Sequence, residues 1–126
     1  MKSPIIGYRI SCEDVLFILK KLTNKNFKNN HSLLKLVDLY NYDGTILDRC
    51  SVVYFKSPKS FTGEDVCEIF IHGSPLIASQ LEKTLKSYNI PGFRIAKNGE
   101  FSYRSVLNNK NSLKQAKAVN SIISNE

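Results

Sequence analysis

The stretch SFTGEDVCEIFIHGS, residues 60–74, places a carboxylate, an aromatic ring and an imidazole at alternate positions of one apolar segment. They are Glu68, Phe70 and His72, within VCEIFIH (66–72). Because side chains alternate across a β-strand, the three point the same way and span about 13 Å at roughly 3.3 Å per residue. A charge inside a strand needs a partner. The row therefore suits either a partly enclosed polar site or a solvent-exposed sheet face with Phe70 half covered.

The opposite face of the same segment is apolar. It carries Cys67, Ile69 and Ile71, which we expect in the core. A metal ion at His72 is not expected, because Cys67 faces away and Glu68 lies too far along the strand to chelate with it. The three cysteines of the chain are scattered and form no CxxC, which favours reduced thiols over a disulfide framework or a zinc site.

Cationic side chains offer further candidates. Arg9 lies inside the apolar segment IIGYRIS (5–11), where it either meets a partner or ligand or is an edge-strand arginine in water. Arg104 and Lys110 flank SVLNN, although a lysine in an asparagine-rich turn is usually solvated. The sequence contains no nucleophile elbow, HExxH or P-loop pattern, so it shows no recognisable apparatus for phosphate hydrolysis.

Strands and helices alternate around these residues. Ser11 is predicted to cap a helix that begins at Cys12, with Asp14 completing a capping box. Ser74 and Pro75 predict the start of a second helix. A polar loop is expected at 23–30, followed by a hairpin of strands 32–40 and 46–55 around Asp43-Gly44. A loop at 56–65 and a strand at 66–72 come next. After the second helix we expect a strand at 93–97, a helical turn at 99–109 and a helix over 112–124. The pattern predicts an α+β fold with a mixed sheet packed with helices.

Length and composition are those of one globular, cytoplasmic domain. The chain has 126 residues, 42% of them hydrophobic, and no apolar run approaches the roughly 20 residues of a membrane helix. Its start, MKSPIIGYRIS, lacks the apolar region of a signal peptide. A net charge of +7 raises the question of nucleic-acid binding. However, 14 lysines against 4 arginines, with abundant asparagine, are typical of AT-biased coding, and no basic stripe is interleaved with aromatics.

The same residues carry a family resemblance. RIS at 9–11, SFTGEDVCEIFIHGS at 60–74, FRIAKNGEFSYRSVLNNK at 93–110 and LKQAKAVNSIIS at 113–124 occur in order along nearly the whole chain. Together they resemble the N-terminal domain of the tRNA-modification GTPase family MnmE, also called TrmE. The blocks TGEDVxE…HG and GEF…R…LNxK are long enough to be specific. On this basis residues 1–111 are expected to form a folate-binding and dimerisation domain, and residues 112–126 the start of a helical domain.

The resemblance implies a fold similar to folate-binding aminomethyltransferase domains. It implies a homodimer that binds a tetrahydrofolate derivative, 5-formyl- or methylene-tetrahydrofolate. With the flavoprotein MnmG, the full-length family forms 5-carboxymethylaminomethyluridine at the tRNA wobble position. GTP, magnesium and potassium belong to its GTPase domain. That domain is expected to be absent here, so the chain is not expected to be catalytic alone.

Carried over residue by residue, the folate contacts fall on Arg9, Glu68 and Lys110. A pterin presents an N–H beside an amino group, a fork that one carboxylate can accept in two parallel hydrogen bonds. Glu68 has that chemistry. Phe70, His72 and Arg104 are further candidates for the pocket wall.

The sequence also departs from the family pattern. Cys12 and Ser74 replace glycines, Ser112 an aspartate and Lys117 a glutamate. Few residues precede Arg9, so a first strand of the family pattern is expected to be missing or misassigned. An isolated domain, a split gene and a decayed fragment all fit this sequence. The alternative functions are a stand-alone basic RNA- or partner-binding module and a non-functional remnant that only dimerises.

Overall fold

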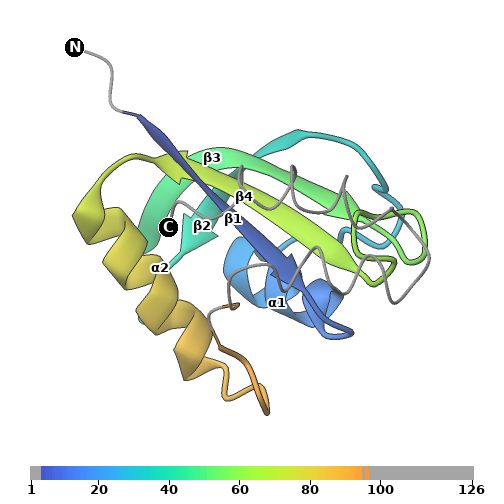
Figure 1. The fold of residues 1–126 in the computed structure, drawn as a ribbon. Coiled ribbons are helices and arrows are strands. Elements are labelled where there is room, and N and C mark those ends of the chain that lie inside the picture. Colours follow the sequence, from blue (N-terminus) through green and yellow to red (C-terminus); the bar gives the residue numbers. More distant parts are fainter. Residues whose placement is uncertain (1–3, 95, 97–126) are drawn as a thin grey trace.

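The structure is a computed structural model that describes residues 4–94 and residue 96 (Figure 1). Its elements are β1 (Ile5–Ser11), α1 (Val15–Thr23), β2 (Lys35–Tyr40), β3 (Ile46–Phe55), β4 (Val66–His72) and α2 (Pro75–Ser87). The predicted α+β class is confirmed. The strand expected at 93–97 is wrong for its described residues, since Phe93, Arg94 and Ala96 are in no strand. The elements expected at 99–109 and 112–124 lie outside the described residues.

The four strands form one sheet in the order β1-β4-β3-β2, and every neighbouring pair is antiparallel. The described sheet is therefore antiparallel rather than mixed. The chain reverses at the β2–β3 hairpin and again in the loop 56–65, while the segment containing α1 carries it from one edge strand to the other. No strand pair is thereby left parallel, and β1 is brought beside β4, although about 60 residues separate them in sequence.

Both helices pack against one face of this sheet. Cys67, Ile69 and Ile71 on β4 are fully buried there, as predicted from the alternation of the strand. They belong to a single cluster with side chains from all four strands and from both helices: Tyr8, Ile10, Ile18, Leu19, Leu22, Val37, Leu39, Cys50, Val52, Tyr54, Leu81 and Leu85. The side chains at the intervening strand positions, Glu68 among them, lie on the opposite face.

One core residue comes from an unexpected place. Phe27 lies in TNKNFKNN, the segment predicted to be a polar loop, yet its side chain is only 1% exposed and joins the core cluster. Residues 24–26 and 28–29 are exposed, whereas Thr23, the last residue of α1, is also buried. The Phe27 ring therefore anchors the exposed part of this segment to the core.

The start of α1 differs from the prediction. The helix begins at Val15 rather than Cys12, and the side chain of the N-cap residue Asp14 makes no capping hydrogen bond. Ser11 does not cap it, because its hydroxyl is engaged elsewhere, with Thr62 and Glu64. Ser11 is the last residue of β1, and its side chain lies on the face away from the helices.

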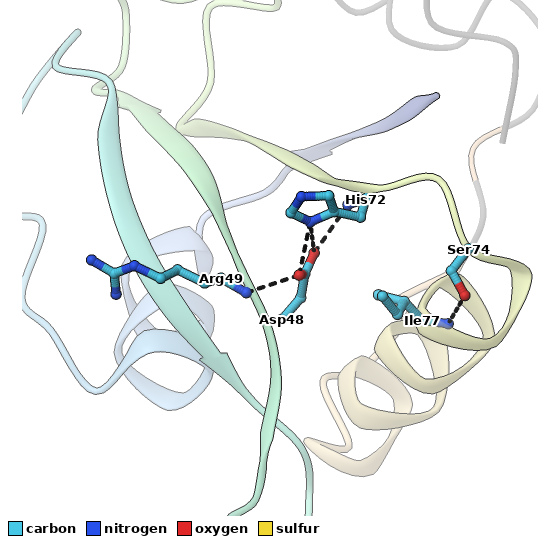
Figure 2. Close-up of polar contacts among 5 residues, drawn as sticks. All are labelled: Asp48, Arg49, His72, Ser74 and Ile77. Atoms are coloured by element: carbon cyan, nitrogen blue, oxygen red, sulfur yellow. Dashed lines mark hydrogen bonds and ion pairs between the residues drawn. The ribbon is translucent and has the colours of Figure 1, made fainter. Parts of the chain in front are cut away.

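The other two turn predictions are confirmed. Ser74 is the N-cap of α2, where its Oγ accepts a hydrogen bond from the Ile77 N–H at 3.3 Å, and Pro75 is the first helical residue (Figure 2). In the β2–β3 hairpin Gly44 has φ 86°, a conformation that glycine adopts without strain. Among the described helices, neither is long and apolar enough to cross a membrane.

Candidate ligand-binding site

Glu68 faces an arginine. It is the direct cross-strand partner of Arg9, and its Oε2 accepts from Arg9 Nε at 2.9 Å and lies 2.7 Å from Arg9 Nη2. The two side chains are 15% and 21% exposed, so the pair is largely shielded but still reachable from solvent. The alternative of Arg9 as an edge-strand arginine in water is therefore wrong. The sequence predicts both residues as separate site candidates, and the antiparallel β1–β4 ladder brings them together.

The aromatic ring of Phe61 packs against the Arg9 side of this pair. The Arg9 guanidinium carbon lies 5.0 Å from the centroid of the Phe61 ring, within cation–π range. Phe61 belongs to the loop 56–65 and is partly exposed. Phe61 is not among the residues predicted from the sequence, although it lies inside the SFTGED block. The available signal was its position in that block, next to residues that anchor the loop.

The TGED residues hold this loop in place. Thr62 is fully buried, and its hydroxyl lies 2.9 Å from the Ser11 hydroxyl. The Ser11 hydroxyl also donates a hydrogen bond to Glu64 Oε1 at 2.7 Å. At the other end of the loop Asp65 Oδ1 accepts from the Ser57 N–H at 2.8 Å. These polar groups are satisfied by one another and by the backbone. Their evident role is therefore to fix the loop, and with it the ring that lies over Arg9.

Phe70 and His72 follow Glu68 at alternate positions along the same face of β4. Phe70 is half-buried between Gly7 of β1 and Ser51 of β3. His72, at the end of β4, is 64% exposed and its Nδ1 lies 2.9 Å from Asp48 Oδ1. Figure 2 shows the Asp48 carboxylate also accepting from the backbone N–H groups of Arg49 and His72.

Within the predicted row, Glu68 thus pairs with Arg9 and His72 pairs with Asp48. The assignment of Phe70 and His72 to a pocket wall stays a prediction. Arg104 and Lys110 lie outside the described residues, and their assignment to the site stays a prediction. Among the residues that the structure does describe, no cluster of three or more His, Cys, Asp or Glu side chains could hold a metal ion.

The cysteines are expected to differ in reactivity. Burial, with a smaller contribution from the nearby Asp48 carboxylate, raises the pKa of Cys50 to about 12. Burial likewise raises the pKa of Cys67, whereas Cys12 is partly exposed. Because the thiolate is the reacting species, a raised pKa slows the attack of a thiol on a disulfide reagent at pH 8.

We expect one thiol, Cys12, to react rapidly with an aromatic disulfide reagent in the native chain, and three after unfolding in guanidinium. Cys12→Ser should abolish the rapid phase. Rapid reaction of two or three native thiols would show that Cys50 or Cys67 is not held in the core.

The described residues thus define a class of protein: an antiparallel α+β domain with a shielded arginine–carboxylate pair on the sheet face opposite its helices. The sequence profile of the family described as "GTP-binding protein TrmE N-terminus" matches residues 1–110. The chain therefore belongs to the TrmE N-terminal family.

Three relatives illustrate the match, and each is called tRNA modification GTPase MnmE. The chain is 43% identical to the protein of Helicobacter pylori (strain HPAG1) over 93% of its own length and 24% of the relative's. The identity to the protein of Rickettsia canadensis (strain McKiel) is 41%, over 99% of this chain and 28% of the relative. The identity to the protein of Francisella tularensis subsp. holarctica (strain OSU18) is 46%, over 91% of this chain and 24% of the relative. The chain spans about a quarter of the length of these curated relatives.

Proposed function

We propose that this chain is the tetrahydrofolate-binding, dimer-forming N-terminal domain of a tRNA-modification GTPase. In that role it would act with the flavoprotein MnmG in forming 5-carboxymethylaminomethyluridine at the wobble position of tRNA, in the cytoplasm. Membership of the TrmE N-terminal family and the names of the relatives support the tRNA-modification part. GTP, magnesium and potassium would be bound by the parts of those longer relatives that this chain does not match.

The Arg9–Glu68 pair is the observation that carries the folate part of the proposal. The pair combines a hydrogen-bond acceptor and a fixed donor fork, and it remains partly open to solvent. Such charged groups, held on rigid strands beside an aromatic ring, are what a polar heterocycle requires for oriented binding. The side chain of Phe61 supplies the ring.

Counting lone pairs gives this proposal a specific form. A carboxylate has about four acceptor positions, two on each oxygen. Oε2 of Glu68 already meets two donor nitrogens of Arg9. A pterin fork that uses both oxygens would therefore displace at least one Arg9 contact, and the freed guanidinium N–H could donate to the pterin carbonyl. Arg9 would in this way hold the carboxylate in place before binding and share the ligand afterwards.

Support for self-association comes from the edge of the sheet. Leu33, Leu34 and Leu36, at and just before the edge strand β2, are each more than half exposed. Apolar side chains gathered along a sheet edge are characteristic of contact surfaces. We include the homodimer in the proposal on this ground, and sedimentation velocity of the chain measures it directly.

Salt dependence distinguishes folate binding from the RNA-binding alternative. Calorimetric titration of the chain with 5-formyltetrahydrofolate at 50 and 300 mM salt should give affinities within a few-fold, because few ions are released by a small ligand in a shielded site. Binding of a tRNA anticodon stem-loop through the +7 charge would instead weaken by orders of magnitude. If no heat of folate binding is detected at either salt concentration and RNA binding is salt-sensitive, the folate proposal is rejected in favour of the RNA-binding module.

A further inference from the structure

A second candidate binding site lies on the helix side of the molecule, away from Glu68. An open groove of about 810 Å³ runs between α1, the β2–β3 turn and the C-terminal end of α2. This volume falls within the range of small-molecule sites. We call it the α1–α2 groove, and its lining includes Phe17, Lys21, Asn24, Tyr42, Ser87 and Tyr88.

Two of the aromatic rings on this lining, those of Phe17 and Tyr42, are exposed to solvent. Phe17 of α1 and Tyr88 after α2 meet edge to face, with ring centroids 6.4 Å apart. Phe17 is half exposed, and Tyr42, in the hairpin turn, is 66% exposed. Neither exposed ring belongs to the core cluster. Large exposed rings that converge on one groove are typical of surfaces on which planar ligands stack.

The groove also carries a cation and polar groups. Lys21 Nζ lies 5.8 Å from the centroid of the Tyr88 ring. Asn24 is the C-cap residue of α1. The Ser87 hydroxyl beside Tyr88 donates to the Thr84 carbonyl at 2.6 Å and so offers a ligand its acceptor lone pairs. Among the lining residues that the structure describes, none is a carboxylate. Asp43 lies between the lining residues Tyr42 and Gly44 in sequence. Its Oδ1 accepts hydrogen bonds from the N–H and the hydroxyl of Thr45, at 3.0 and 2.6 Å.

This combination narrows the chemistry of the ligand. A planar ring can stack on Tyr42 or Phe17, amide and hydroxyl groups can bind the edge of a heterocycle, and Lys21 can bind an anion attached to it. We propose that the α1–α2 groove binds a nucleotide, meaning a heteroaromatic base that carries a phosphate. The nucleotide is either free or part of a single RNA strand, and both sources present the same base and phosphate.

No continuous sequence motif encodes such a groove. Its rings come from α1, from the hairpin turn and from the end of α2, and only the fold brings them together. The sequence therefore contains no stripe of alternating basic and aromatic residues, although the structure gathers both types in one place.

The test is titration of the isotope-labelled chain with uridine monophosphate, and separately with a short oligouridine, followed by amide chemical shifts. We expect shifts at Asn24, Tyr42 and Gly44, with Tyr42→Ala weakening binding roughly tenfold or more. Lys21→Gln should lower the salt slope of oligouridine binding by about one. Leu76→Ala, equally exposed but at the other end of α2, is the matched control and should bind normally.

The two titrations also separate the sources. Shifts with both ligands identify a site for any nucleotide, and shifts with oligouridine alone identify a strand-binding site. Absence of groove shifts with either ligand, or unchanged binding by Tyr42→Ala, would overturn the proposal. Glu68→Gln should leave nucleotide binding intact, so failure here is distinct from failure of the folate proposal.

Discussion

Replacing Glu68 by glutamine is expected to weaken binding of 5-formyltetrahydrofolate by about tenfold to a hundredfold. The variant keeps the shape of the side chain but removes the charge and one acceptor oxygen. A hydrogen bond to a charged group contributes about 1.5–3 kcal/mol, which sets this range. Calorimetric titration of the variant beside the unchanged chain measures the ratio of the two dissociation constants.

The chain offers a matched control for this substitution. Asp38 of β2 also faces an arginine across the ladder, with its Oδ1 3.0 Å from Arg49 Nη1. Asp38→Asn therefore removes the charge of a second cross-strand pair, one that belongs to no proposed site, and should leave folate affinity unchanged. Both variants should keep the circular dichroism of the original chain. Equal affinity in Glu68→Gln and the unchanged chain would remove Glu68 from the site.

Phe27→Ala is expected to produce the largest loss of stability, about 3–5 kcal/mol in the free energy of unfolding. The ring is nearly inaccessible and packs in the core cluster, so its removal costs burial energy and leaves a cavity. For a chain of 126 residues, between the two size classes for which the relation is known, 1 kcal/mol corresponds to roughly 3–6 °C in Tm. We therefore expect Tm to fall by about 9 °C or more in a thermal scan.

Tyr42→Ala provides the comparison for an aromatic residue that is mostly solvent-exposed. Surface changes of this kind usually alter stability by less than about 0.5 kcal/mol, so its Tm should move by only a few degrees. If Phe27→Ala and Tyr42→Ala melt at similar temperatures, Phe27 is not a core residue, and the segment 23–30 is a simple polar loop.

Local signals in the sequence predicted much of the fold. The alternation in VCEIFIH gave both the strand and its buried face, because one side of that strand packs against helices. Ser74-Pro75 and Asp43-Gly44 predicted a helix start and a turn, since capping and positive φ depend on the residues at those positions.

What the sequence could not predict depends on contacts between distant segments. Ser11 has the composition of an N-cap, yet its hydroxyl bonds the loop around Thr62 instead. Phe27 looks like one apolar residue in a solvated loop until the core is assembled around it.

For the site, Arg9 and Glu68 are predicted from the sequence as charges that need partners, but only the β1–β4 register makes them partners of each other. Phe61 was missed, because its position over Arg9 depends on how the loop 56–65 folds back. His72 was grouped with Glu68 by alternation alone, whereas the structure pairs it with Asp48 on the neighbouring strand.

Mapping bound folate onto the sheet tests the central claim most directly. The isotope-labelled chain would be titrated with 5-formyltetrahydrofolate and its backbone amide shifts recorded. We predict that the largest changes fall on Arg9, Phe61 and Glu68, on the sheet face opposite the helices. Saturable binding that leaves these three amides unmoved, or no binding at millimolar ligand in folded protein, would contradict the assignment.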